Sequence, residues 1–163
     1  MSGPELLQHM GSHILHDPHL KDTDNPCGFC LSMGRLCAIH LVKHKKTGGK
    51  IDIVNSRCPN LKKISMANAS KCTEKSPCTN IPIQCPLCPK VSDAMWKYNM
   101  GAHIHISHPS ANLMNYEELY SISPKETILM KGIHKRPPKP KKLKMATHTL
   151  AISEGHSSWL VIR

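Results

Sequence analysis

The stretch CPLCPKVSDAMWKYNMGAHIHISH, residues 85–108, places two cysteines ahead of two histidines. Cys85 and Cys88 are separated by two residues, and His103 follows after a further 14, with His108 five positions beyond it. Zinc in proteins is bound by four such thiolate and imidazole ligands in a tetrahedron. A cysteine knuckle followed by a histidine-bearing helix supplies them. The spacing therefore predicts a Cys2His2 site with zinc as its ion.

The predicted ion is structural, because its four protein ligands close the coordination shell. A catalytic zinc keeps one position open for water. Asp93 is the only nearby acid that could act as a base. A zinc deaminase would carry glutamate two residues after the ligand histidine, where this chain has Leu15 after His13 and His105 after His103. We expect no catalytic residues, no small-molecule substrate and no enzyme activity.

The helix of this predicted finger has few residues that could read bases. Counting back from His103 places Trp96, Asn99 and Ala102 at the three base-facing positions. Only Asn99 can form a bidentate contact with a base. We expect Trp96 instead to cover the zinc, on the same helix face as Met100. A single finger spans about three base pairs, so sequence-specific binding by this helix alone is not expected.

The composition favours a fold that is held together by metal. The 163 residues include 13 prolines but only one phenylalanine, two tryptophans and three tyrosines, against eight cysteines and 12 histidines. A small unit with so little to bury usually needs disulfides or a metal. The N-terminus lacks the pattern of a signal peptide, so a reducing compartment and metal ligation are expected. No apolar run approaches the roughly 20 residues of a membrane span.

A second site is predicted upstream, with two ligand sets open. His9 and His13 lie four residues apart on a predicted helix, and Cys27 and Cys30 form a Cys-x-x-Cys knuckle after it. These residues repeat the Cys2His2 set with the helix first. The histidines could equally be solvated residues of an amphipathic helix. The rival set is all sulfur: Cys27, Cys30, Cys58 and Cys78. Either set leaves Cys37 and Cys72 as small, unligated hydrophobes.

Local signals predict an α+β fold of small zinc-stabilised modules. Ser2 and Glu5 fit a capping box for a helix over residues 2–16. Residues 36–43 and 50–56 predict a β-hairpin that turns at Gly48-Gly49. A weak helical signal surrounds residues 61–69, and further helices are expected over 112–122 and from Ser123-Pro124 onward. The predicted parts are an N-terminal zinc module, a finger, a short helical segment and a tail: 2–78, 79–110, 111–133 and 134–163.

Positive charge concentrates near the C-terminus of the sequence. The formal net charge is +11, and seven Lys or Arg but no acid lie between Lys131 and Lys144. The prolines in this run prevent a helix, so we expect an extended, solvated tail. A solubilising linker, a nuclear import signal and a phosphate-binding segment are three interpretations of it. The candidate nucleic-acid contacts are Lys135, Arg136, Lys139, Lys141, Lys142 and Lys144 of the tail, with Asn99 of the finger.

Several motifs in combination resemble a Cys2His2-type zinc-finger protein family of mushroom-forming fungi. They are ELLQHMGSHILHDP, PCGFC, CPNL, SPCTNIPIQCPLC and the WKYNM segment with its two histidines, and the resemblance covers residues 4 to about 133. It implies His9, His13, Cys27 and Cys30 as ligands of the first zinc, and it supports Cys85, Cys88, His103 and His108 for the second. This chain departs from the family at Phe29, where leucine is usual. The family implies no activity.

These observations predict a binding module that holds two structural zinc ions. The leading hypothesis is a nuclear, nucleic-acid-associated or regulatory protein whose basic tail supplies phosphate affinity. The alternative is a nuclear or cytoplasmic adaptor whose hairpin or finger helix docks a protein partner. Neither hypothesis involves a membrane. A salt titration separates the two, because phosphate-driven binding weakens steeply with added salt.

Overall fold

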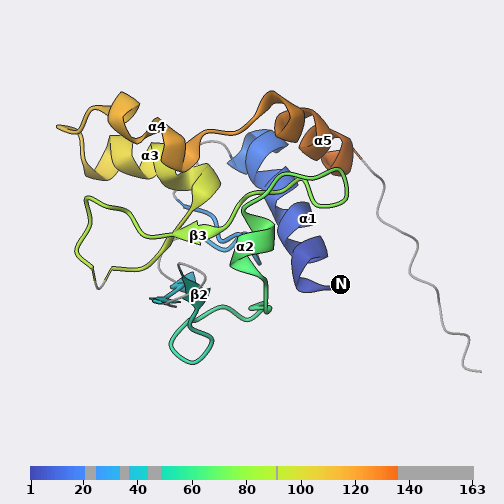
Figure 1. Ribbon diagram of the computed structural model, residues 1–163, viewed down its shortest axis with the longest axis horizontal. Coiled ribbons are helices and arrows are strands. Elements are labelled where there is room, and N and C mark those ends of the chain that lie inside the picture. The colour runs from blue at the N-terminus through green and yellow to red at the C-terminus, as the bar shows by residue number, and fades with distance from the viewer. Residues whose placement is uncertain (21–24, 34–36, 44–48, 91, 136–163) are drawn as a thin grey trace, which may run out of the picture.

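The computed structural model describes residues 1–20, 25–33, 37–43, 49–90 and 92–135, and these form an α+β fold. Helices form most of the regular structure, and the strands form two separate two-stranded sheets. Figure 1 shows α1 and α5 side by side at one end of the molecule, and α3 with α4 at the other. The basic tail from residue 136 onward lies outside the described residues.

Helix α1, Gly3–His16, begins where its capping box predicts. The Ser2 side chain accepts a hydrogen bond from the Glu5 backbone N–H, and the Glu5 carboxylate accepts one from the Ser2 N–H at 2.8 Å. These two bonds satisfy donors that an uncapped helix leaves free. Leu6, Leu7 and Ile14 form its buried face. The helix ends at His16 with Asp17 as its C-cap, and a short 3-10 turn, η1 (Pro18–Leu20), follows.

Both sheets are antiparallel and very short. Strands β1 (Leu41–Val42) and β2 (Lys50–Ile51) pair Leu41 with Ile51, which confirms the predicted hairpin, although Gly48 lies outside the described residues. Strands β3 (Pro82–Ile83) and β4 (Met95–Trp96) pair Pro82 with Trp96. Two-residue strands add little stability of their own. The loops between them must therefore be fixed by other contacts.

The remaining helices follow the predicted order. Helix α2 (Met66–Ala69) lies in the segment with a weak helical signal, and α3 (Lys97–Ser107) follows β4 directly. The predicted helix over 112–122 forms as a 3-10 turn, η3 (Leu113–Tyr116), continued by α4 (Glu117–Tyr120). Helix α5 (Pro124–His134) starts at Ser123, whose side chain accepts from the Glu126 backbone N–H at 3.2 Å.

A buried carboxylate fixes α5 to the middle of the chain. Glu126 is 1% exposed, and its carboxylate accepts hydrogen bonds from the Thr79 N–H and hydroxyl, each at 2.7 Å, and from the Tyr98 hydroxyl. On the same helix, Met130 is fully buried in the larger core against α1. The helix is therefore part of the folded unit and not an appendage of it.

The larger core crosses the boundaries that were predicted between modules. It combines Leu6 and Leu7 of α1 with Phe29 of the knuckle and with Trp96, which lies in the finger segment. The backbone also crosses, since the Ala94 N–H donates to the Ile39 carbonyl at 2.7 Å. A smaller core of Cys85, Met100 and Ile104 lies beside η3 and α4. The N-terminal and finger segments are thus packed together.

Candidate metal centres

Four cysteine thiols from separate loops converge in the N-terminal segment. Cys27 and Cys30 come from the knuckle after α1, Cys37 precedes β1, and Cys58 follows β2. The Cys30 and Cys37 sulfurs are 3.2 Å apart, and Cys58 Sγ lies 3.7 Å from both Cys27 Sγ and Cys30 Sγ. Four sulfurs around one tetrahedral zinc would be about 3.8 Å apart. This four-cysteine group could therefore hold one metal ion.

The knuckle loop is shaped by its own backbone. The Leu31 N–H donates to the Cys27 carbonyl at 2.9 Å, and the Cys27 N–H donates to the Ser32 carbonyl at 3.0 Å. Leu31 adopts a left-handed backbone with φ of 59°, which lets the chain reverse within these few residues. The Phe29 N–H points at Cys27 Sγ from 3.5 Å. Both cysteine side chains are thus aimed at one point, and a backbone donor faces one sulfur.

Without a cation, the surroundings of the four-cysteine group disfavour the thiolate form of most of its thiols. Burial raises the pKa of the Cys27 thiol, and burial with the Cys30 hydrogen bond raises the pKa of Cys37 to about 12. Burial likewise raises the pKa of Cys58. Burial also acts on Cys30, but its hydrogen bonds with Ser32, Cys37 and Cys58 together outweigh burial and lower the pKa of that thiol. Four thiolates this close would repel one another, so a cation is needed to stabilise them.

The second group joins two cysteines to two histidines as the sequence predicts. His103 Nε2 lies 3.3 Å from Cys88 Sγ. His108 Nε2 lies 3.3 Å from Cys88 Sγ and 3.7 Å from Cys85 Sγ. The cysteines follow β3, and His103 lies on α3. These four residues form a Cys2His2 group that could hold one metal ion.

The end of α3 explains the five-residue spacing of the histidines. Residues five apart on a continuous helix point in different directions, because each residue turns the helix by about 100°. Helix α3 ends at Ser107, and His108 leaves helical geometry with φ of −133°. His103 Nδ1 also lies 3.4 Å from the Ser107 hydroxyl, which leaves its Nε2 facing the sulfurs. Met100 and Ile104, both fully buried, back the group with apolar contacts.

The two groups face a common cavity. A hollow of about 260 Å³ is lined by Cys27 and Cys37 from the first group and by Cys88 and His103 from the second. Ligands of both groups are therefore reachable from one side of the molecule.

The first group corrects the ligand set that was predicted from sequence. His9 and His13 do not join Cys27 and Cys30, whose partners are Cys37 and Cys58. The rival all-sulfur set was right about Cys58 and wrong about Cys78, which is buried elsewhere with its thiol 3.5 Å from the Leu7 carbonyl. Cys37, expected to be unligated, is the fourth member. Its place beside the hairpin was the available signal, because the hairpin brings Cys37 and Cys58 together.

Trp96 and Asn99 have roles other than those predicted for them. Trp96 does not cover the Cys2His2 group but packs edge-on against Phe29, with ring centroids 5.1 Å apart, in the larger core. Asn99 is 9% exposed, and its amide donates to the Pro26 carbonyl at 3.0 Å and to Asn25 Oδ1 at 3.3 Å. The amide that was a candidate base contact is therefore used inside the fold.

The predicted nucleic-acid contacts of the basic tail lie at and beyond the end of α5. Lys135 is the exposed C-cap residue of that helix. The other predicted phosphate contacts lie outside the described residues: Arg136, Lys139, Lys141, Lys142 and Lys144. Their assignment stays a prediction from sequence.

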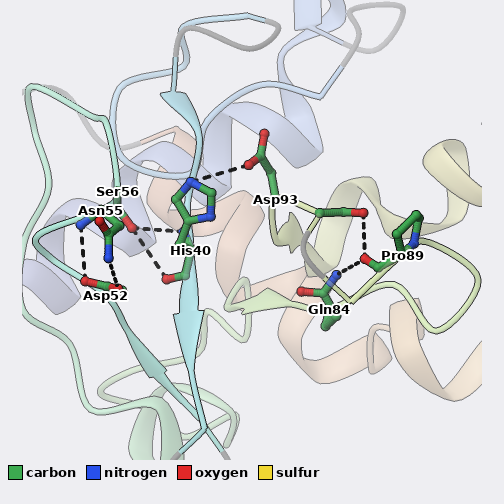
Figure 2. Close-up of polar contacts among 8 residues, drawn as sticks. His40, Asp52, Asn55, Ser56, Gln84, Pro89 and Asp93 are labelled. Carbon is green, nitrogen blue, oxygen red and sulfur yellow. Dashed lines mark hydrogen bonds and ion pairs between the residues drawn. The ribbon is translucent and has the colours of Figure 1, made fainter.

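A polar hollow of about 690 Å³ lies between the hairpin and the residues that flank Cys85 and Cys88, among them Gln84, Lys90 and Asp93. In Figure 2, His40 and Asp93 face each other across it, with His40 Nε2 3.5 Å from Asp93 Oδ1. Figure 2 also shows Asp52 held by Asn55, whose side-chain amide donates to it at 2.6 Å. Hydrogen bonds from Asn55 lower the pKa of Asp52. Asp93, the acid considered as a base, is thus engaged with His40 and not with a metal ligand.

Comparison of the chain with family models, with curated proteins and with solved structures gives no match. Among the residues that the structure describes, no helix combines the length and the apolar character needed to cross a membrane. The function must therefore be inferred from the two metal groups and from the surfaces around them.

Proposed function

We propose that the protein is a binding module whose two groups each hold a structural zinc ion. Thiolate and imidazole donors in sets of four suit zinc, and both sets are complete without a water ligand. The observation that carries this proposal is the convergence of Cys27, Cys30, Cys37 and Cys58 from three loops onto one point. In the described part of this segment, strands β1 and β2 beside these loops are only two residues long, so the ion would substitute for a larger core.

We further propose that the module is nuclear and nucleic-acid-associated, with affinity supplied by the basic tail. The clustering of Lys and Arg between residues 131 and 144 supports non-specific phosphate binding. Base reading by α3 has little support, because Asn99 is buried and Gly101 of the same helix packs against Tyr120 of α4. The zinc ions would then shape the fold, and the tail would bind phosphates.

A salt titration of full-length protein on a DNA duplex tests the tail. Replacing Lys139, Lys141 and Lys142 with glutamine should weaken binding and flatten the log-log salt dependence by about 0.9 for each phosphate that is no longer neutralised. The charge-matched control replaces the exposed Lys62, Lys63 and Lys71 instead. Equal weakening in the two triple variants would show that general charge, and not the tail, drives binding.

A protein-docking adaptor is the second candidate, and the hairpin supports it. Val54 is 91% exposed, and Val42 and Ile53 are 50% and 42% exposed on the same hairpin region. Exposed apolar side chains that gather on one element are typical of interaction sites. Binding by this surface should respond little to salt and should be lost in Val54→Asp, whereas tail-driven binding should be unaffected by that change.

A further inference from the structure

Histidines that take no part in either thiol-containing group meet where α1 and α5 pack together. His9 and His13 lie one helical turn apart on α1, and His134 is the last residue of α5. The His9 and His13 ring centroids are 4.8 Å apart, and those of His13 and His134 are 5.1 Å apart. His13 therefore connects His9 and His134 in a His9–His13–His134 cluster that joins the two helices. The His16 ring of α1 lies farther from His134, with centroids 6.0 Å apart.

The ring geometry of this cluster matches that of the histidines in the Cys2His2 group. The planes of His13 and His134 are inclined at 81°, and the His9 and His13 planes at 87°. His103 and His108 have centroids 5.3 Å apart and the same 81° inclination. Two imidazoles on one tetrahedral ion have centroids about 5 Å apart, given a metal–nitrogen distance of about 2.0 Å. The His9–His13 and His13–His134 centroid distances are thus similar to those of two rings that share an ion.

The surroundings of two of these imidazoles also suit metal ligation. Asp17 Oδ2 lies 3.5 Å from His13 Nδ1, which leaves His13 Nε2 as the free donor. Histidine ligands commonly hold a carboxylate on their other nitrogen in this way. Among the described residues, His134 Nδ1 is buried and makes no hydrogen bond. A buried ring nitrogen without a partner costs free energy that an ion would offset.

His9 is exposed, so its side chain can rotate, and an ion can reach the cluster from solvent. The ligand nitrogens of these three histidines do not all lie within 4.8 Å of one another, as those of the two thiol-containing groups do, so side-chain rotation is part of binding.

We propose that His9, His13 and His134 form a third site, which binds a divalent transition-metal ion and clamps α5 onto α1. Imidazole ligands suit zinc, copper and nickel ions. With three protein ligands and no thiolate, the site should bind zinc more weakly than the four-cysteine and Cys2His2 groups do. This third site is separate from the two structural zinc groups, and it shares no ligand with them.

The test is a calorimetric titration of full-length protein with Zn²⁺, after elemental analysis has fixed the occupancy of the two tight groups. One additional, weaker equivalent is expected. His13→Ala and His134→Ala should each weaken it about tenfold or more, since even the loss of an outer partner of a metal ligand costs that much. His105→Ala, an exposed histidine on α3, is the control and should leave it unchanged. No third equivalent, or one that survives both variants, would overturn the proposal.

A second measurement uses the unaltered protein and so does not depend on the variants folding. Diethyl pyrocarbonate acylates free imidazole nitrogens, and mass spectrometry locates the modified residues. Added Zn²⁺ should protect His9, His13 and His134 while leaving His105 reactive. Equal acylation of all four with and without Zn²⁺ would also overturn the proposal. A low occupancy of the tight groups would instead count against the two structural ions.

Discussion

Gly28 marks the point where the knuckle touches the finger segment. A Cβ at this position would lie 2.5 Å from Trp96 Cε3, and the Trp96 ring is rigid and 2% exposed. The sequence CGFC predicts a knuckle, but the reason for its glycine lies in Trp96, far along the chain. A spacing pattern in the sequence can explain such a glycine only when the residue that packs against it is close in the chain. The same limit explains why the prediction that Trp96 covers the zinc was wrong.

Gly28→Ala should destabilise the protein by about 1 to 3 kcal/mol, because overpacking a filled core has costs of this size. The control is Gly132→Ala on α5, where an added Cβ meets nothing within 4 Å. That change should stabilise the helix, by up to about 1 kcal/mol. Urea unfolding at fixed zinc concentration measures both. Equal effects of the two substitutions would show that the packing of Gly28 on Trp96 is not tight.

Tyr98 and Cys78 make the stability sensitive to alkaline pH. Burial, with the neighbouring Cys78 and Glu126 side chains, raises the pKa of Tyr98 above its ordinary value of 10.0. Burial also raises the pKa of Cys78, from 9.0 to about 11. The unfolded chain therefore loses these protons first as the pH rises. Their contribution is complete below pH 9 and declines above it, first for the thiol and above pH 10 for the phenol.

Tyr98→Phe should remove the phenol's share of this decline. Between pH 10 and 11, an ordinary phenol in the unfolded state costs about 1 kcal/mol of stability relative to one kept protonated by folding. The wild-type protein should lose that much more than the variant over this interval, measured by urea unfolding at each pH. Parallel declines in the two proteins would mean that Tyr98 ionises normally when folded.

At the scale of elements, local signals account for where helices begin and long-range contacts for where they lie. The capping box of Ser2 and Glu5 predicts α1, and Ser123 with Pro124 predicts α5. The docking of α5 on α1 was not predicted, because it depends on Glu126 meeting Thr79 and Tyr98. Glutamate on a short helix is usually solvent-exposed, so sequence pattern alone gives no reason to bury it.

Glu126→Ala should release α5 and cost about 3 kcal/mol, because it removes the buried acceptor of the Thr79 hydroxyl. It also leaves the Thr79 N–H and the Tyr98 hydroxyl with only long contacts, at 3.3 Å to the Tyr98 oxygen and 3.6 Å to Cys78 Sγ. Hydrogen exchange should show faster exchange over residues 124–134, with α3 retaining its protection. Glu118→Ala, at an exposed position on α4, is the matched control and should change stability by about 0.5 kcal/mol or less. If Glu126→Ala were as stable as Glu118→Ala, Glu126 would not be the residue that anchors α5.

At the scale of the whole molecule, two small cores and two candidate metal groups support one packed unit. The Cys2His2 group was predictable, because its four ligands lie within 24 residues and follow a local spacing. The four-cysteine group was predictable only in part: Cys27 and Cys30 form a local pair and Cys58 belonged to the all-sulfur alternative, whereas Cys37 is brought to Cys58 by the hairpin. The ligand set of this group is the part of the structure that differs most from what the sequence spacing predicts.

Native mass spectrometry of the full-length chain, after dialysis against a weak chelator, tests that ligand set directly. The wild-type protein should retain two zinc ions, Cys37→Ser should retain one, and Cys72→Ser, which alters a cysteine outside both groups, should retain two. Removal of one ligand from the four-cysteine group leaves three thiols and an open coordination position, which binds zinc less tightly. Two ions in Cys37→Ser, together with the loss of one ion when His9 and His13 are replaced by alanine, would contradict the four-cysteine group and restore the helix-first set.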